Sequence, residues 1–365
     1  MSGRTEDERF MAAAIRLCRR NLGLTATNPS VACLIVKDGV IVASAVTAPG
    51  GRPHAETQAL AEAGEAARGA TAYVTLEPCS HHGKTPPCAD ALIAAGVARV
   101  VVSVTDPDER VAGRGLSMLR DAGIAVETGV LESDGRNALA AYLTRQTKKR
   151  PHVTLKLAVS TDGMLGRLGA GQVAITGPAS RGQVHVLRAE TDAILIGIGT
   201  ALADDPELTC RLPGLETRSP VRIVLDPRLE LSPASKLART ARQVPVIVVT
   251  AKDRKSEPAF AARQEALEAL GVEVLICDPR ELDALLAALA TRGISSLLVE
   301  GGARAARSFL DAGLVDRIML FTGAAAIGKE GVASPFVSGR MPDGFSLRHA
   351  ARYGADSLQE YERDD

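Results

Sequence analysis

Apolar and polar positions alternate with a changing period along the first half of the chain, which predicts helices and strands in turn. Two apolar runs, Val31–Val36 and Val40–Val46, flank the tripeptide Lys37-Asp38-Gly39. Because Asp-Gly between two apolar runs favours a tight turn, this segment predicts a β-hairpin. The other elements that we expect here are helices over Glu6–Asn21, Glu56–Ala63, Ala89–Ala95 and Leu116–Ala122, and strands over Ala72–Leu76, Val100–Val104 and from Ile124.

The second half of the chain repeats this alternation. A β-rich run extends from His152 to Ser160, and Asp162-Gly163 after it predicts a turn. Helical stretches fall between several later apolar runs, which is typical of an α/β domain with its own sheet. The expected elements are strands over Ala193–Ile198, Val221–Leu225, Val244–Thr250, Val272–Ile276, Ser296–Val299 and Arg317–Phe321, and helices over Ser180–Ala189, Ala261–Leu270, Glu281–Thr291 and Arg304–Ala312.

A basic, polar stretch between the halves, Arg145–Pro151, is the candidate for a domain boundary. A charge run of this kind also occurs at a solvated helix end, so both interpretations stay open. A chain of 365 residues is long enough for two domains of ordinary size. We therefore expect one domain over residues 1–147 and a second over residues 151–365.

The charge balance and the scarcity of aromatic residues bear on the class of substrate. Lysine plus arginine and aspartate plus glutamate both number 43, so the chain has no net charge that would attract a polyanion. Aromatic residues make up 3% and tryptophan is absent, which removes the usual stacking platforms for unpaired bases. Both features disfavour a nucleic-acid-editing protein, which is the more distant alternative. They favour a small, nucleotide-like substrate and no nucleic-acid partner.

The chain also lacks the patterns of membrane and secreted proteins. No run of about 18 or more uncharged apolar residues occurs, and the N-terminus lacks the basic-then-apolar layout of a signal peptide. The six cysteines show no disulfide-framework spacing. We therefore expect a cytoplasmic protein without a membrane partner.

One constellation of residues carries specific chemistry: His54-Ala-Glu56, then Pro78-Cys79, then Cys88. On the predicted elements, His54 and Cys88 each begin a helix and Cys79 follows a strand, so their side chains meet at one edge of a sheet. An imidazole and two thiolates give zinc three protein ligands and leave the fourth position for water, whose pKa the metal lowers. Glu56 suits a proton shuttle. This order of residues is the signature of zinc-dependent nucleobase deaminases.

Two alternative interpretations of these residues are weaker. A lone histidine or cysteine is more often a core residue than a ligand, and some chance pairing among six cysteines is unremarkable. Chance does not easily place His-x-Glu, Pro-Cys and a further cysteine in that order at element boundaries. The second alternative is a structural zinc site, which is disfavoured because such a site is normally closed by four protein ligands.

A second motif follows a predicted strand in the other half. Gly301 and Gly302 lie between that strand and the next helix. Glycines there allow backbone N–H groups and the positive end of the helix to approach a phosphate. Two glycines in this position also occur for tight turning alone, and the segment is not a Rossmann fingerprint.

Together these motifs resemble the bifunctional deaminase–reductases of riboflavin biosynthesis, over nearly the whole chain. Eight residues separate Cys79 from Cys88, a spacer that is odd for a generic deaminase but typical of this family. The matching stretches are Pro53–Glu56, Tyr73–Cys88, Ala91–Val97, Leu155–Gly163, Leu202–Pro206 and Val299–Gly302.

The resemblance implies a cytidine-deaminase-like α/β/α domain followed by an α/β domain similar to dihydrofolate reductase. The first domain would use zinc to deaminate a diamino-hydroxy-pyrimidine that carries a ribosylamino 5′-phosphate. The second would use NADPH to reduce the ribosyl group to ribityl. We also expect a homo-oligomer, with a dimer favoured.

The family's functional residues carry over position by position. In the first domain the resemblance implies His54, Cys79 and Cys88 as zinc ligands and Glu56 as the proton shuttle. The positions near the first substrate are Asn28, His81 and Lys84. In the second domain it implies Lys156 and Glu300 as catalytic residues. Glu300 also lines the substrate site with Gln172, Arg188, Leu208 and Arg211. The positions that would hold NADPH are Ala158, Ala174, Thr200, Asp204 and the loop from Gly302.

Some of these positions have simpler interpretations, and some depart from the family. His81 and Lys84 fit an exposed polar loop, and Asp204 fits a turn before a proline. Where the family has Ser-x-Trp-Ile-Thr, this chain has Gln172 and Ala174, so an aromatic residue that would pack on the cofactor is lost. This difference favours the main alternative, a monofunctional deaminase whose second domain only binds a nucleotide or supports a dimer. The retained Lys156, Asp204 and Glu300 argue against it.

Overall fold

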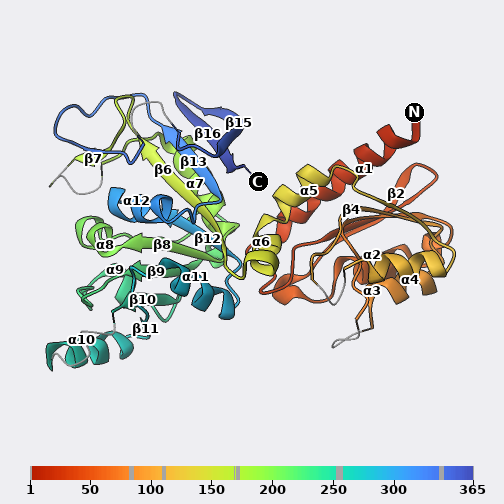
Figure 1. The fold of residues 1–365 in the computed structure, drawn as a ribbon, viewed down its shortest axis with the longest axis horizontal. Coiled ribbons are helices and arrows are strands. Elements are labelled where there is room, and N and C mark those ends of the chain that lie inside the picture. Colours follow the sequence, from red (N-terminus) through yellow and green to blue (C-terminus); the bar gives the residue numbers. More distant parts are fainter. Residues whose placement is uncertain are drawn as a thin grey trace. The chain divides into compact units, whose positions relative to one another are not determined.

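A computed structural model of the protein describes residues 2–81, 86–108, 112–167, 169, 173–251, 258–336 and 341–364. The chain divides into two compact units, Met1–Lys149 and Arg150–Asp365, called the first and the second unit below (Figure 1). Each unit is built of helices packed on a sheet of its own. None of the described helices is both long and apolar enough to cross a membrane.

The sheet of the first unit has, in the described part of the chain, the strand order β2-β1-β3-β4-β5. The strands are β1 (Ala32–Lys37), β2 (Val40–Val46), β3 (Thr71–Leu76), β4 (Arg99–Val104) and β5 (Ala125–Thr128). Strands β1 and β2 form the predicted hairpin, and Asp38 and Gly39 at its turn both have positive φ angles, 51° and 76°. Strands β3, β4 and β5 run parallel, so their carboxyl ends meet at one edge.

Helices cover both faces of this sheet. Along β1, Cys33 and Ile35 pack into the core beneath α2, α3 and α4, whereas Ala32 and Leu34 pack into the core beneath α1. This period of two is what a strand buried on both faces requires. The helices of the unit are α1 (Ser2–Cys18), α2 (Ala55–Ala63), α3 (Cys88–Ala94), α4 (Arg114–Asp121), α5 (Glu132–Ala138) and α6 (Ala140–Lys148).

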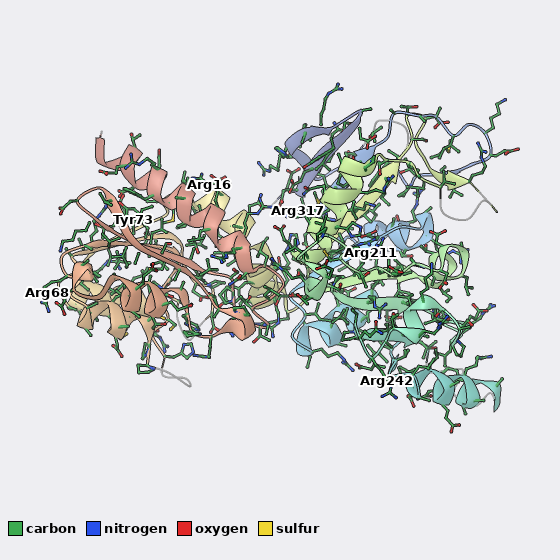
Figure 2. The ribbon with its side chains drawn as sticks, turned by 180° about the vertical axis from the view of Figure 1, so that it is seen from behind. Arg16, Arg68, Tyr73, Arg211, Arg242 and Arg317 are labelled. Atoms are coloured by element: carbon green, nitrogen blue, oxygen red, sulfur yellow. The ribbon has the colours of Figure 1, made fainter. Side chains whose placement is uncertain are left out.

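A buried carboxylate ties α1 to the sheet. Asp7 accepts a hydrogen bond of 2.7 Å from the hydroxyl of Tyr73 in β3 and two from the guanidinium of Arg99 in β4, at 2.7 and 2.8 Å. Figure 2 labels Tyr73 among the side chains of the first unit. The hydrogen bond from Arg99 lowers the pKa of Asp7, against the effect of burial. Asp7 therefore supports the fold of the first unit at a position outside the constellation of His54, Cys79 and Cys88.

The larger sheet of the second unit has the strand order β11-β10-β9-β8-β12-β6-β13-β16-β15 among the described residues. Its strands run parallel from β11 to β13, and β16 and β15 add an antiparallel hairpin at the edge. Two short strands, β7 and β14, pair separately. The strands are β6 (His152–Val159), β7 (Met164–Arg167), β8 (Ala193–Gly197), β9 (Val221–Leu225), β10 (Val246–Thr250), β11 (Glu273–Ile276), β12 (Ser296–Glu300), β13 (Arg317–Thr322), β14 (Gly331–Ala333), β15 (Phe345–Tyr353) and β16 (Asp356–Arg363).

Helices cover both faces of this sheet as well. One core contains α11 and α12 with Leu195 and Val299, and the other contains α9 and α10 with Ile194 and Leu298. Consecutive residues of one strand therefore face opposite layers. The helices of the unit are α7 (Pro178–Ala189), α8 (Ile198–Asp204), α9 (Lys236–Arg239), α10 (Pro258–Glu268), α11 (Leu282–Thr291) and α12 (Ala303–Asp311).

The expected elements are present, with ends that differ by at most four residues. The largest difference is α1, which begins at Ser2 and not at Glu6, because its polar first turn carries no apolar periodicity. Helices α5, α6, α8 and α9 and strands β7, β14, β15 and β16 were not expected as such. Residues 145–148, the basic stretch at the proposed boundary, form the end of α6, and the first unit ends at Lys149.

Candidate active sites

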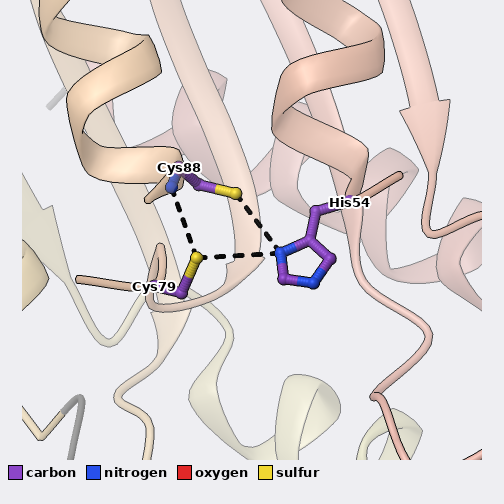
Figure 3. Close-up of side chains that lie close together, drawn as sticks. All are labelled: His54, Cys79 and Cys88. Carbon is purple, nitrogen blue, oxygen red and sulfur yellow. Dashed lines mark hydrogen bonds between the residues drawn. The ribbon is translucent and has the colours of Figure 1, made fainter. Parts of the chain in front are cut away.

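Three elements of the first unit bring His54, Cys79 and Cys88 together (Figure 3). His54 is the residue before α2, Cys79 follows the end of β3, and Cys88 is the first residue of α3. Because both helices begin at the edge where β3 ends, the ligand atoms converge there. This is the arrangement that the sequence predicted.

The ligand atoms are close enough to share one metal ion. The Nδ1 atom of His54 lies 3.4 Å from Sγ of Cys88 and 3.7 Å from Sγ of Cys79. All three ligand atoms lie within 4.8 Å of one another. One nitrogen and two sulfurs are the donors that zinc prefers, and a set of three leaves a coordination position for water or substrate. The residues therefore fit a catalytic zinc ion.

Hydrogen bonds prepare Cys79 to act as a thiolate. The side chain of Cys88 is the largest cause that lowers the pKa of Cys79, to about 4, and the backbone N–H of Cys88 also donates to its Sγ, at 3.3 Å. The same contact between the two thiols raises the pKa of Cys88. The hydrogen bond with Cys79 raises the pKa of His54.

Glu56 lies in the first turn of α2, and 4% of it is exposed. Burial is the largest cause that raises its pKa, to about 7, and the negative charge on Cys79 acts in the same direction. A carboxyl group with a pKa near the working pH can both accept and release a proton. Its environment therefore suits the predicted proton shuttle.

The three positions predicted near the first substrate are placed unequally. Asn28 packs against Gly51, three residues before His54, so that a Cβ atom on this glycine would lie 2.3 Å from Nδ2 of Asn28. His81 lies in the segment between the two cysteines, and its Nδ1 atom is buried with no hydrogen-bond partner among the described residues. Lys84 lies outside the described residues.

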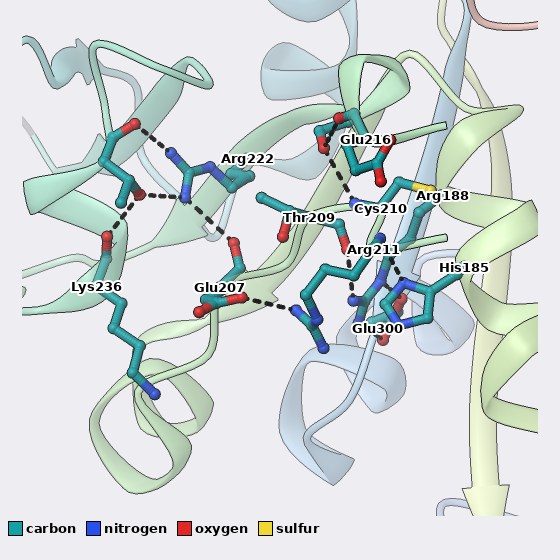
Figure 4. Close-up of polar contacts among 12 residues, drawn as sticks. His185, Arg188, Glu207, Thr209, Cys210, Arg211, Glu216, Arg222, Lys236 and Glu300 are labelled. Atoms are coloured by element: carbon teal, nitrogen blue, oxygen red, sulfur yellow. Dashed lines mark hydrogen bonds and ion pairs between the residues drawn. The ribbon is translucent and has the colours of Figure 1, made fainter. Parts of the chain in front are cut away.

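The second unit gathers charged residues at the carboxyl ends of its central strands (Figure 4). Lys156 of β6 and Glu300 of β12 are register partners in neighbouring parallel strands, and Nζ lies 3.9 Å from Oε2. Arg188, near the end of α7, donates to both carboxylate oxygens of Glu300, at 2.8 and 3.0 Å. The three side chains are 10–14% exposed. The structure thus brings together three residues that the sequence predicted for one site.

This cluster holds two cations around one anion. Burial lowers the pKa of Lys156, while the charge of Glu300 acts against that effect. Burial alone would raise the pKa of Glu300, but Arg188 and Lys156 lower it to about 2. Glu300 is therefore ionised, and the surplus positive charge suits an anionic ligand.

A backbone segment that includes Leu208 and Arg211 lies against α7. Arg188 donates to the carbonyl oxygen of Thr209 at 3.1 Å, and the N–H of Arg211 donates to Nδ1 of His185 at 3.3 Å. Leu208 is buried and has a φ angle of 59°. The guanidinium of Arg211 pairs with Glu207 at 3.0 Å and is half exposed, so it is available to a phosphate.

The structure places the positions predicted for NADPH on α8 and the adjoining Gly302, beside a pocket, and on β6. Thr200 of α8 lies against Gly302, where a Cβ atom would be 2.9 Å from Oγ1 and the φ angle is 69°; Asp204 ends the same helix. Ala174 lines a pocket with Ser160 and Ala325, and its volume is about 220 Å³. Ala158 lies in β6 two residues after Lys156. Gln172, which was predicted to line the substrate site, lies outside the described residues.

Sequence reasoning assigned no role to Glu77 or His185. Glu77 is a buried carboxylate directly before Pro78-Cys79. The feature of the sequence that could have revealed it is a charged residue at the end of an apolar strand. His185 precedes Arg188 by three residues on α7, a spacing that places both side chains on one helix face. Burial is the largest cause that lowers the pKa of His185, and the charges of Arg188 and Arg211 add to it. A neutral imidazole can accept the N–H of Arg211.

Comparison with known proteins agrees with this geometry. The model of the cytidine and deoxycytidylate deaminase zinc-binding region matches residues 4–104, and that of the RibD C-terminal domain matches residues 151–358. The riboflavin biosynthesis protein RibD of Aquifex aeolicus (strain VF5) is 42% identical over 323 residues, which cover 88% of each chain. That of Escherichia coli (strain K12) is 40% identical over 336 residues, which cover 89% of each chain. The chain belongs to the RibD family.

A solved structure supports the same assignment. The crystal structure of a diaminohydroxyphosphoribosylaminopyrimidine deaminase/5-amino-6-(5-phosphoribosylamino)uracil reductase from Thermotoga maritima matches with a TM-score of 0.86 and 35% identity, and covers 99% of each chain. The expected family, its two α/β domains and its bifunctional activity are confirmed. The protein is a deaminase and reductase of riboflavin biosynthesis, with zinc and NADPH as cofactors.

Proposed function

We propose that residues 1–147 deaminate a diamino-hydroxy-pyrimidine carrying a ribosylamino 5′-phosphate, and that residues 151–365 then reduce its ribosyl group to ribityl. The name of the Thermotoga maritima relative, which contains both reactions, supports this pair of substrates. The observation that carries the first assignment is the convergence of His54, Cys79 and Cys88 beside a buried Glu56. The second rests on the cluster of Lys156, Arg188 and Glu300.

In the first site, His54, Cys79 and Cys88 would hold the zinc ion, which lowers the pKa of a coordinated water toward neutrality when bound. Glu56 would accept the proton of the attacking water and deliver it to the ring nitrogen. The same carboxylate would then take the proton of the hydroxyl group added to the ring carbon and pass it to the departing amine, which leaves as ammonia. A pKa of about 7 suits both directions of transfer. Asn28 would contact polar groups of the substrate, and His81 and Lys84 its phosphate.

In the second site, Glu300 would orient Lys156 toward the sugar, where the lysine ammonium can protonate the ring oxygen as the C1′–O bond breaks and C1′ becomes a protonated imine, the group that is then reduced. Arg188 and Arg211 would bind the ribose phosphate, with Gln172 and Leu208 also lining that site. NADPH supplies a hydride when bound. The positions that would hold it are Ala158, Ala174, Thr200, Asp204 and the loop from Gly302, whose glycine permits close approach of the backbone.

We also propose that the enzyme works as a cytoplasmic homodimer. Thiolate ligands such as Cys79 favour a reducing compartment. The edge strand β15 carries the exposed Leu347, which supports association between copies of the chain. Sedimentation equilibrium of the purified protein measures the oligomeric state directly, and a monomer at micromolar concentration would contradict the dimer.

The substrate class is tested by removing the phosphate. Deamination and reduction are each assayed with the 5′-phosphate and with the dephosphorylated nucleoside analogue. We expect KM to rise for both steps when the phosphate is missing, because Lys84 in the first site and Arg188 and Arg211 in the second are the proposed phosphate contacts. Equal KM values for the two compounds in both assays would contradict the proposed substrate.

A further inference from the structure

Glu77 connects the zinc-ligand segment to the segment that follows β4. Its own N–H donates to the carbonyl oxygen of Val104 at 2.9 Å, which continues the pairing of β3 with β4 past the last strand residue. The side chain is 3% exposed. No cation in the described part of the chain forms a salt bridge with it. The carboxylate is instead used entirely on backbone N–H groups.

Those backbone groups come from one segment, far along the chain. Oε2 of Glu77 accepts hydrogen bonds from the N–H groups of Asp106 at 3.3 Å and Gly113 at 3.1 Å, and Oε1 accepts one from Gly115 at 3.2 Å. Burial is the largest cause that raises the pKa of Glu77, and these backbone donors oppose it. A carboxylate fits this position because it only accepts hydrogen bonds and three backbone N–H groups point toward it.

The same segment packs directly on the residue before Cys79. A Cβ atom at Gly115 would lie 2.1 Å from the carbonyl oxygen of Pro78, so only glycine permits this approach. At its start, the carboxylate of Asp106 accepts the hydroxyl hydrogen of Tyr142, at 3.0 and 3.1 Å. Asp106 at one end and Gly113 and Gly115 at the other are thus held in place, and Gly115 lies directly against Pro78.

We infer that Glu77 is a positioning residue of the deaminase site, which fixes the backbone around Cys79 so that its thiolate is aligned with His54 and Cys88 for the metal. This inference deepens the proposed function and depends on it. Glu77 acts through Cys79 and has no contact with the reacting atoms. Because a rigid ligand set binds metal more tightly than a mobile one, loss of this carboxylate should loosen the metal without removing any ligand.

The test compares Glu77→Gln with Asp7→Asn, a matched loss of a buried carboxylate in the same unit. Zinc affinity is measured by competition with a chelator, and cobalt-substituted protein reports the thiolate ligands through its charge-transfer absorption. We expect Glu77→Gln to bind zinc at least about 10-fold more weakly, the lower end for an outer partner of a metal ligand, with an altered cobalt spectrum. Asp7→Asn should lower the melting temperature yet keep the wild-type zinc affinity and spectrum.

A second variant guards against failure of the first to fold. Glu77→Asp keeps the charge but is one methylene shorter, so it cannot reach both glycine N–H groups, and it should show a smaller loss of zinc affinity. Wild-type zinc affinity and cobalt spectrum in the folded Glu77 variants would overturn the inference, as would an equal loss in Asp7→Asn. A wild-type protein that binds no zinc would overturn the proposed function itself.

Discussion

Lys156 and Glu300 face each other across two neighbouring parallel strands, with Nζ 3.9 Å from Oε2. Both side chains are nearly buried, and Arg188 makes a bidentate contact with the same carboxylate. Glu300 therefore keeps the bidentate contact of Arg188 when Lys156 is replaced. This arrangement fits the proposed roles, in which Glu300 orients and Lys156 acts on the substrate.

Replacing Lys156 tests that division of roles. Lys156→Met preserves the length of the side chain and leaves Glu300 paired with Arg188, so the fold should persist. We expect kcat of the reductase step to fall by about 10²-fold or more, the usual size of a general acid contribution. Zinc content and ammonia release should stay at the wild-type level. Lys236→Met, at an exposed lysine of α9, is the control, and an equal loss in both variants would contradict a catalytic role.

Glu56→Gln tests the proton shuttle in the other unit. The substitution keeps the shape of the side chain but removes its ability to accept a proton. We expect deamination to slow by about 10²-fold or more while zinc stays bound. The reductase step, assayed with the deaminated substrate, should be unchanged. Loss of both activities in parallel would argue against two separate sites.

The metal content follows from the three ligands. Elemental analysis should find about one zinc ion per chain, as expected of a site with three protein ligands and one open position. Cys88→Ser should lose the metal and the deaminase activity. Cys277→Ser, at a cysteine of the second unit, is the matched control and should keep both. Full zinc occupancy in Cys88→Ser would contradict the assignment of ligands.

Short-range patterns account for much of what the sequence predicted. The turn at Asp38 and Gly39 and the helix starts at His54 and Cys88 depend on neighbouring residues, so they were correctly placed. The hairpin of β15 and β16 was missed because β15 is an edge strand with few buried residues and therefore weak apolar alternation. Strands β7 and β14 are short, and their pairing depends on residues more than 160 positions apart.

The site residues also divide into those that a local motif reveals and those that depend on contacts between distant parts of the chain. His54, Glu56, Cys79 and Cys88 form a local motif whose chemistry is visible in the sequence. The contacts of Glu77 with Gly113 and Gly115 span more than 35 positions and arise only once β3 and β4 pair. A single sequence contains no signal for which backbone N–H groups a buried carboxylate will meet.

Ala174 offers a prediction about cofactor affinity. It lines a pocket of about 220 Å³ at the position where relatives carry an aromatic residue, as the family resemblance implies. Ala174→Trp should restore packing worth on the order of 1–3 kcal/mol, judged from the apolar area of an aromatic side chain. This corresponds to a roughly tenfold to hundredfold lower KM for NADPH, with little change in kcat. An unchanged or higher KM would show that the pocket does not receive the cofactor.

The ion pair of Arg150 and Asp316 predicts how the stability of the second unit depends on pH. Burial alone would raise the pKa of Asp316, but the hydrogen bonds from Arg150 lower it to about 2 from the ordinary value of 3.8. The ionised form of Asp316 is therefore stabilised in the folded state relative to the unfolded state, in which the group has its ordinary pKa. Its contribution, roughly 2 kcal/mol, is present above about pH 4 and is lost as the pH falls through about 2.

Asp316→Asn removes that titration. Denaturant unfolding from about pH 6 to pH 2 should show a shallower loss of unfolding free energy in this variant than in the wild type, because one carboxylate no longer protonates on unfolding. Asp311→Asn, at an exposed aspartate that ends α12, serves as the comparison and should follow the wild-type curve. Identical slopes in Asp316→Asn and the wild type would contradict the pKa of this group.

The central claim is that one chain performs both reactions, and a single anaerobic incubation tests it. Purified zinc-loaded protein is mixed with the phosphorylated diamino-pyrimidine and NADPH, and ammonia release and nicotinamide absorbance are followed together. We predict that each turnover releases one ammonia and oxidises one NADPH, with ammonia leading. Ammonia release without any loss of nicotinamide absorbance at saturating NADPH, and without a ribityl product, would contradict the account.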